Sequence, residues 1–230
     1  MNRLPDGVAG LLEYLDGIGY GELYLPRRGA RSPAGRKAAG DAGERAARLS
    51  AVAEEASACT RCGLSRTRRT VVFGTGDPDA ELMFIGEGPG AQEDRQGLPF
   101  VGPAGELLDK IIAAIGRRRE EVYIANIVKC RPPGNRDPEP EEAEACRGYL
   151  ERQIELVQPR VIVALGRVAA QNLLDTRAPL GRLRGQWHEV RGVPTRATYH
   201  PAALLRNASF KRPTWEDMQV VRDRLAEEEG

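Results

Sequence analysis

Short apolar stretches alternate with segments of helical periodicity along most of the chain. The apolar stretches are rich in β-branched residues and give way to Gly, Asn or His, which is typical of buried strands. They are ELMFIGEG (81–88), EVYIANIVK (121–129), RVIVALG (160–166) and TRATYHP (195–201). The segments with helical spacing are AGELLDKIIAAIG (104–116), PEEAEACRGYLERQIELV (140–157), RVAAQNLL (167–174) and TWEDMQVVRDRLAEE (214–228).

This alternation predicts an α/β fold in which a mainly parallel sheet is covered by helices on both faces. In such sheets, ligands bind beyond the carboxyl ends of the strands. The polar residues that end the predicted strands are therefore the first candidates for function, and they are Glu87, Asn126 and His200. Structural roles are the simpler alternatives, a backbone cap for Asn126 and a packed imidazole for His200.

The first fifty residues follow a different pattern. GLLEYLDGIGYGELYL (10–25) has apolar residues at helical spacing, and the segment from residue 26 to 47 is rich in Gly, Arg and Ala. We expect a short docking helix and a flexible tether there, and a further helix over ERAARLSAVAEEASAC (44–59). The predicted organisation is an N-terminal extension (1–50) followed by one domain (51–230).

The composition is that of an ordinary soluble globular protein, with 41% hydrophobic and 29% charged residues among 230. No run approaches the roughly 18 to 20 apolar residues of a membrane span, and the first ten residues lack the apolar core of a secretory signal. We therefore expect a cytoplasmic protein without a membrane partner. The net charge of +1 indicates no partner, but residues 176–212 hold eight Arg or Lys against the single Glu189, and this basic region could meet phosphate.

Four cysteines stand at two distant places in the chain. Cys59 and Cys62 form a C-x-x-C pair, Cys130 follows the second predicted strand, and Cys146 lies in the next predicted helix. Disulfides are rare in a reducing compartment, so ligation of a metal or cluster is the favoured interpretation. Spacing alone allows zinc, an iron-sulfur cluster or four small buried side chains.

A glycine-rich loop, GEGPGAQEDRQGLPFVG (86–102), follows the first predicted strand. Pro89 breaks the spacing that a dinucleotide-binding fingerprint requires, so we reject that interpretation. The loop carries Glu87, Glu93 and Asp94, which would ordinarily be solvated acids, and one aromatic residue, Phe100.

Three motifs of this chain together resemble the family 4 uracil-DNA glycosylases. They are the glycine-rich loop (86–102), NIVKCRPPGNR (126–136) and HPAALLRN (200–207), in this order and framed by the four cysteines. The resemblance covers Cys59 to about Leu225. It implies a three-layer α/β/α sandwich around a four-stranded parallel sheet. The protein would be a monomer that acts on uracil-containing DNA. The same resemblance implies one structural 4Fe-4S cluster, with ligands Cys59, Cys62, Cys130 and Cys146.

The resemblance also implies an activity and roles for individual residues. Such an enzyme flips uracil out of DNA and hydrolyses its N-glycosidic bond, leaving an abasic site. The implied catalytic residues are Glu87, which positions water, His200, which stabilises the departing uracil at O2, and Glu93 and Asn135, which assist Glu87. In the implied substrate pocket, Phe100 stacks on uracil, Asn126 hydrogen-bonds its edge, and the backbone of Gly88 closes the pocket beside Glu93. Outside the pocket, Leu204 or Leu205 would be the wedge that fills the place of the flipped base, and Arg206 would contact phosphate.

Related glycosylases have Asp or Asn at the position of Gly88, whereas the family 4 pattern uses Glu87 as the water-positioning carboxylate.

Two alternatives to this activity remain open. A relative that binds abasic DNA covalently uses a histidine on an inserted basic loop, but this chain has no histidine before His188. A non-catalytic binding module would have no need of the polar strand ends. For the N-terminal extension two roles stay open, docking of a repair or replication partner and a simple tether.

Overall fold

The computed structural model describes residues 39–227. The docking helix predicted over residues 10–25, and most of the tether, lie outside the described residues. Within them, no helix has both the length and the apolar character needed to cross a membrane.

Six strands form one sheet in the order β1-β3-β2-β4-β6-β5. Their bounds are β1 Thr75–Gly76, β2 Leu82–Gly86, β3 Tyr123–Asn126, β4 Val161–Leu165, β5 Trp187–Val190 and β6 Val193–Thr198. The central four, β3, β2, β4 and β6, are parallel, as predicted. The expected count of four is wrong for the whole sheet, because the antiparallel strands β1 and β5 add an edge on each side. The sequence pattern missed them because β1 is two residues long and β5 is only partly buried.

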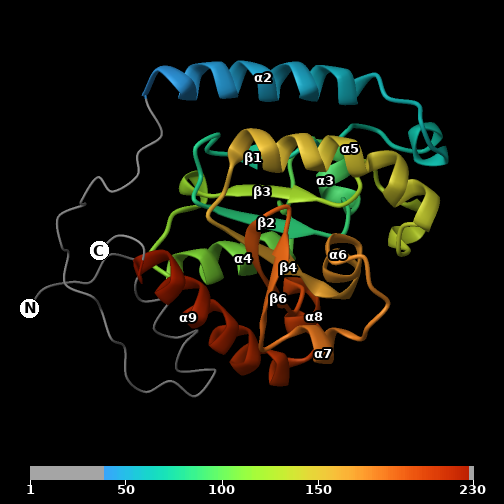
Figure 1. Ribbon diagram of the computed structural model, residues 1–230. Helices are drawn as coiled ribbons and strands as arrows, with labels where there is room; N and C mark the ends of the chain where they lie inside the picture. Colours follow the sequence, from blue (N-terminus) through green and yellow to red (C-terminus); the bar gives the residue numbers. More distant parts are fainter. Residues whose placement is uncertain (1–38, 228–230) are drawn as a thin grey trace, which may run out of the picture.

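Helices cover both faces of this sheet, which confirms the predicted three-layer α/β/α architecture (Figure 1). Their bounds are α2 Ala39–Ser57, α3 Ala91–Gln96, α4 Pro103–Ala114, α5 Pro140–Val157, α6 Gly166–Leu173, α7 Leu180–Leu183, α8 Pro201–Arg206 and α9 Lys211–Glu227. Short 3-10 turns are η1 Gly63–Arg66, η2 Arg119–Glu121, η3 Pro133–Asn135 and η4 Ala208–Phe210.

The alternation of side chains along the central strands divides the interior into two cores. On one face, Met83 and Ile85 of β2 pack in a cluster with side chains of α2, α5 and α6. On the other face, Leu82 and Phe84 of the same strand pack with side chains of α4, α8 and α9. Strands buried on both faces read as continuous apolar runs, and this explains why the pattern located them.

Helix α2 crosses the predicted boundary between extension and domain at residue 50. Leu49 and Val52 are 6% and 2% exposed in the core beneath it, and Arg152 of α5 binds Glu55 at 2.5 Å. The helix therefore packs on α5 on both sides of residue 50 (Figure 1). A truncated protein intended to test the extension should begin no later than residue 39.

Candidate active site at the carboxyl ends of the strands

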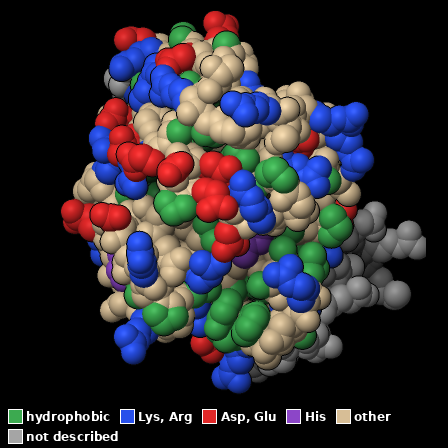
Figure 2. Space-filling model, turned by 90° about the vertical axis from the view of Figure 1, so that its right-hand side faces the viewer, with side chains coloured by type: hydrophobic (Ala, Val, Ile, Leu, Met, Phe, Trp, Pro, Cys, Tyr) green, Lys and Arg blue, Asp and Glu red, His purple; other side chains and the backbone are tan. Residues whose placement is uncertain are grey.

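The three predicted strand ends meet at one edge of the sheet. Gly86, the last residue of β2, stands opposite Asn126, the last residue of β3, and Glu87 follows directly. His200 follows β6, on the far side of β4. Figure 2 shows the face formed by this edge, where acidic, basic and hydrophobic side chains surround a histidine near its centre. Cavities of about 390 and 450 Å³ lie along α5 instead, so side chains rather than volume identify this site.

Gly86 allows two side chains to converge at this edge. A Cβ atom on Gly86 would lie 2.4 Å from Asn126 Oδ1 and 2.7 Å from Phe100 Cζ, both far inside contact distance. The Asn126 side chain is 2% exposed, and its Oδ1 is buried without a hydrogen-bond partner among the described residues. A buried acceptor without a partner is unfavourable, so Asn126 is arranged to receive a donor from outside the protein. The sequence analysis overlooked Gly86, although a glycine closing an apolar strand indicates such a close approach.

Phe100 is held in a left-handed backbone conformation, with φ = 52°. Its backbone passes so close to Gly105 that a Cβ there would lie 1.9 Å from the Phe100 carbonyl oxygen. Non-glycine residues rarely adopt this conformation, and when they do they cluster at functional sites. Its ring is 5.5 Å from the His200 ring, centroid to centroid, at an interplanar angle of 29°.

Glu93 fixes the segment that follows Phe100. Its Oε1 accepts hydrogen bonds from the Val101 and Gly102 amides at 3.0 and 3.2 Å, at the start of α4. Its neighbour Asp94, 3% exposed, accepts one from the Arg69 amide at 2.9 Å. The expectation that loop acids are merely solvated is wrong for both residues. Glu93 acts in this geometry as a loop anchor.

His200 is the N-cap of α8. Its Nδ1 accepts a hydrogen bond from the Ala202 amide at 3.1 Å, which leaves the ring proton on Nε2. Burial, together with the positive charge of Arg206, lowers the His200 pKa to about 4, against a smaller opposing effect of Glu93. At neutral pH the imidazole is therefore neutral and offers an N–H donor. Gly166 lies against it, since a Cβ there would be 2.9 Å from the His200 Cβ.

Glu87 is half-buried beside an ion pair. Burial above all, together with the negative charge of Asp137 and against the opposing charge of Arg167, raises the pKa of Glu87 to about 7. Asp137 and Arg167 bind each other, and both are about half exposed. A carboxyl group with a pKa near neutrality can hold or release a proton in the physiological range, which suits a residue that orients water.

Three other residues that the sequence predicts for the site, Asn135, Gly88 and Leu204, lie in different surroundings. Asn135, at φ = 56°, is exposed, and its side chain accepts a hydrogen bond from Arg131 at 2.8 Å. A Cβ on Gly88 would lie 2.7 Å from a Val128 methyl, so Gly88 packs against the strand connection. Leu204 is 1% exposed in the core under α8, and this makes the wedge assignment wrong for that residue.

Leu205 and Arg206, by contrast, are free to meet a partner. Leu205 is 53% exposed, and Arg206 is exposed at the last position of α8. No ion pair of Arg206 occurs in the described part of the chain. An exposed leucine beside an exposed arginine fits insertion between bases next to a phosphate contact.

The four cysteines are free thiols, and Cys130 and Cys146 lie in the core cluster against which Cys59 and Cys62 pack. Cys130 and Cys146 are buried, burial raises the pKa of both, that of Cys130 to about 11, and Cys62 lies within electrostatic reach of both. Arg68 joins the two halves of the set, donating to Cys130 Sγ at 3.4 Å and to the Cys59 carbonyl at 2.7 Å.

These thiols can be tested against the two groups that the sequence allows. Within residues 39–227, no three Cys, His, Asp or Glu side chains are arranged as ligands of a single metal ion. A four-iron cluster takes one thiolate on each iron, so its ligands stand further apart. Four free thiols that share one core cluster, with Arg68 bonded to both halves of the set, have the chemistry of such a donor set.

The family model described as the uracil DNA glycosylase superfamily matches residues 73–219. The chain belongs to this superfamily. The type-4 uracil-DNA glycosylases of Archaeoglobus fulgidus and Thermotoga maritima are 45% and 44% identical to it over 75% and 77% of the chain, covering 91% and 94% of those relatives. The type-4 enzyme of Saccharolobus solfataricus is 43% identical over 77% of the chain and 87% of its own length.

Membership in this superfamily confirms the resemblance drawn from three motifs, and with it the class of enzyme, a glycosylase. The matched region spans β1 to α9 and includes the three polar strand ends of the candidate site, Glu87, Asn126 and His200. It begins after Cys62, so the first cysteine pair lies outside the superfamily match.

Proposed function

We propose that the protein removes uracil from DNA by hydrolysing the N-glycosidic bond, releasing free uracil and leaving an abasic site. The observation that carries this proposal is the buried, unpartnered Asn126 Oδ1, framed by Gly86 and the Phe100 ring at the edge of the sheet. An orphaned amide oxygen beside an aromatic ring suits a planar base that presents an N–H. The neutral His200 and the carboxyl group of Glu87 flank this position.

Recognition of the base follows from the Asn126 amide. Its Oδ1 accepts from uracil N3–H while its Nδ2 donates to uracil O4, and the base stacks on the Phe100 ring. Cytosine presents the reverse arrangement of donor and acceptor at these atoms, so it would leave buried groups unpaired. Each unpaired group costs about 1 to 3 kcal/mol, which corresponds to roughly 5- to 150-fold in discrimination.

Departure of the base is assisted by His200. As the glycosidic bond breaks, uracil leaves with negative charge, and the neutral imidazole donates Nε2–H to uracil O2. The bond from the Ala202 amide to Nδ1 fixes this tautomer and orients the ring before the substrate binds. The donor is therefore preorganised and needs no protonation step.

The sugar, which becomes cationic, is met by Glu87. Its carboxylate stabilises the oxocarbenium-like sugar and orients the water that attacks it. Glu93 supports this arrangement indirectly, since it fixes the backbone that carries Phe100. Asn135 contributes through the loop between Cys130 and α5, where Arg131 holds its side chain. Access of the base requires flipping, for which Leu205 fills the vacated stack and Arg206 contacts phosphate.

Cys59, Cys62, Cys130 and Cys146 would hold the cluster, which would supply a structural cross-link and no bond-breaking chemistry. These ligands would tie the segment after α2 to the loop that carries Asn135. Monomeric action on DNA and a partner contact through the N-terminal extension belong to the same proposal. A covalent cross-linking role is less well supported, because neither His188 nor His200 lies on an inserted loop.

The direct test uses the full-length protein and a labelled oligonucleotide with one deoxyuridine. We expect alkali-labile breakage at that position and release of free uracil. Matched oligonucleotides with cytosine or thymine at the same position serve as controls and should stay intact. If the oligonucleotide is bound but never becomes alkali-labile, the protein is a non-catalytic binding module and the proposed activity is refuted.

The pH dependence should report Glu87 and not His200. Glu87 must be ionised to act, so kcat/KM should fall about tenfold per pH unit below its pKa of about 7 and level off above it. His200, with a pKa of about 4, stays neutral over this range. We expect Asp137→Asn to move the acid limb to lower pH and Arg167→Gln to move it to higher pH, since they remove opposite charges.

The measurement is kcat/KM on a uracil oligonucleotide from about pH 5 to about pH 9, a range that brackets the Glu87 pKa on both sides. Glu87→Gln should abolish the acid limb together with most of the activity. Activity that stays level down to about pH 5, as a limb near the His200 pKa would give, would contradict the assignment, and so would an acid limb that neither charge variant shifts.

The cluster is testable without any activity assay. Purified protein should be straw-brown with a broad absorbance shoulder near ~400 nm, and Cys146→Ala should lose this shoulder and its iron. Because metal binding is coupled to folding, the melting temperature should fall with it. Ala143→Ser on the same helix is a suitable control for the substitution itself, and a colourless wild type containing zinc would refute the cluster.

A further inference from the structure

The segment that carries His200, Leu205 and Arg206 leaves the sheet after β6 and returns to the fold at the start of α9. Its two ends are joined by a pair of rings. Tyr199 and Phe210 are stacked with centroids 4.2 Å apart and ring planes within 9° of parallel. Both rings are half-buried against the core beneath α4 and α9. The excursion over residues 200–209 is therefore closed at its base by side chains rather than by strand pairing.

Arg184, at the end of α7, supports this stack from the other side. Its guanidinium lies 4.5 Å above the Tyr199 ring, so a cation and two rings form one column. The same guanidinium binds Asp217 at 2.7 Å and donates to the Pro213 carbonyl at 2.6 Å. It thus ties the strand end to the first turn of α9.

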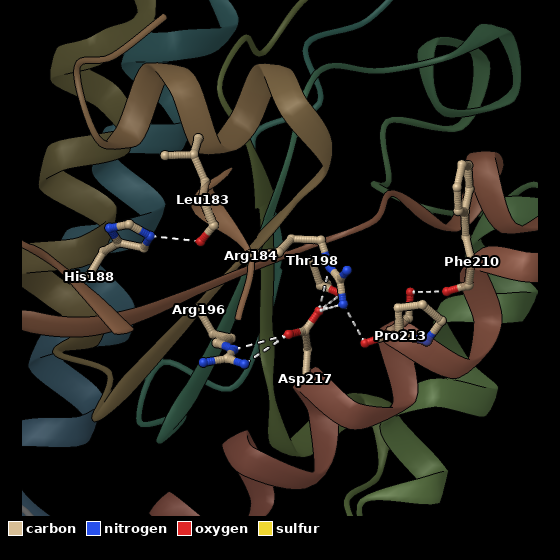
Figure 3. Close-up of polar contacts among 9 residues, drawn as sticks. Leu183, Arg184, His188, Arg196, Thr198, Phe210, Pro213 and Asp217 are labelled. Atoms are coloured by element: carbon tan, nitrogen blue, oxygen red, sulfur yellow. Dashed lines mark hydrogen bonds and ion pairs between the residues drawn. The ribbon is translucent and has the colours of Figure 1, made fainter. Parts of the chain in front are cut away.

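Asp217 is the hub of this arrangement and is 1% exposed (Figure 3). Besides Arg184 it accepts from Arg196 at 3.0 Å and from the Thr198 hydroxyl at 2.8 Å, both on β6. A buried carboxylate that loses its partners is strongly destabilising, so this network is rigid when complete. Separately, Thr214 at the start of α9 donates to the Phe210 carbonyl at 2.8 Å.

We propose that the Tyr199–Phe210 stack, supported by Arg184 and Asp217, is a clamp that holds the 200–209 excursion ready to enter duplex DNA. This inference rests on the proposed function and adds positioning residues to it. An exposed leucine can fill a vacated base position only if its segment is already ordered, since otherwise the ordering entropy is lost on binding. Within the segment itself, Pro201 and Leu204 are buried and His200 caps α8, and the clamp adds an anchor at the two ends of the segment.

The clamp matters for duplex DNA above all. A single strand has no stacked partner strand, so flipping leaves no hole for Leu205 to fill. We therefore expect Phe210→Ala to lower kcat/KM about tenfold on a duplex containing deoxyuridine, because it removes one aromatic pair and the order that this pair imposes. On the same strand alone, the fall in kcat/KM should be much smaller. Leu205→Ala should show the same dependence on the duplex.

Two further variants separate positioning from stability. Phe210→Tyr keeps the ring and should retain the wild-type ratio of duplex to single-strand activity. Val221→Ala in α9 removes a buried methyl pair from the same core without touching the stack, so it should lower the melting temperature and leave the ratio unchanged. If Phe210→Ala fails to fold, Phe210→Leu removes the stack while keeping apolar volume.

The ratio of kcat/KM on the duplex to kcat/KM on the single strand tests the clamp. A lowered ratio in Phe210→Ala or Phe210→Leu, with Val221→Ala unchanged, supports the clamp. An unchanged ratio overturns it, as does a wild type that excises uracil from single strands alone. A wild type that excises uracil from neither substrate refutes the proposed function itself, which is a different result.

Discussion

His200→Asn should lower kcat for uracil release by about 10²- to 10³-fold while leaving the fold intact. That is the usual loss when one preorganised donor to a developing oxyanion is removed. Asparagine is among the best N-cap residues, so its side chain can still accept from the Ala202 amide and cap α8. The substitution therefore separates the cap from the Nε2–H donor.

The comparison variants make this result specific. His200→Ala should lose the same activity and also about 1 kcal/mol of stability, because it removes the cap as well. His188→Asn replaces the second histidine, which bonds the Leu183 carbonyl at 2.8 Å, and should leave kcat unchanged. The measurements are single-turnover uracil release and urea unfolding. Near wild-type release by His200→Asn would show that the imidazole serves only as a cap.

The central sheet could be predicted from the sequence because parallel strands buried on both faces leave a strong signal. β2 and β4 are buried at every position, and the helix predicted over residues 140–157 has the same bounds as α5. The edge strands escaped because β1 is short and β5 is partly exposed, so neither needs a continuous apolar run.

The candidate site was predictable where it depends on strand ends and less so where it depends on three-dimensional contact. Glu87, Asn126 and His200 come together because they end parallel strands of one sheet. Residue type alone could not show that Glu93 binds the backbone of the Phe100 loop. Neither could it show which of two adjacent leucines is buried, because α8 is too short for a helical period to distinguish them.

The hub at Asp217 shows the same limit. Asp217 stands in the polar-looking segment TWEDMQVV, where an acid is ordinarily solvated. In the fold it is buried because Arg184 and Arg196 reach it from α7 and β6. Two members of the basic excess over residues 176–212, Arg184 and Arg196, therefore point into the protein, whereas Arg206 is exposed at the site.

Gly86→Ala should cost more activity than its single methyl group suggests. The new Cβ would lie 2.4 Å from Asn126 Oδ1 and 2.7 Å from Phe100 Cζ, so the amide and the ring must both move. Losing both Asn126 hydrogen bonds to uracil removes about 2 kcal/mol or more, which corresponds to a fall in kcat/KM of more than about 30-fold. Overpacking at the end of β2 should lower the free energy of unfolding by about 1 to 3 kcal/mol.

The effect of Gly86→Ala should be confined to the base pocket. Gly148→Ala, at an exposed position of α5 where a Cβ meets nothing within 4 Å, should keep full activity and gain about 0.5 to 1 kcal/mol of stability. DNA that already contains an abasic site has no base to place beside Asn126, so the Gly86→Ala variant and the wild type should bind it with equal affinity. Weakened binding of abasic DNA would instead mean that the substitution deforms the whole DNA-binding face, and unchanged uracil release would mean that Asn126 and Phe100 do not hold the base.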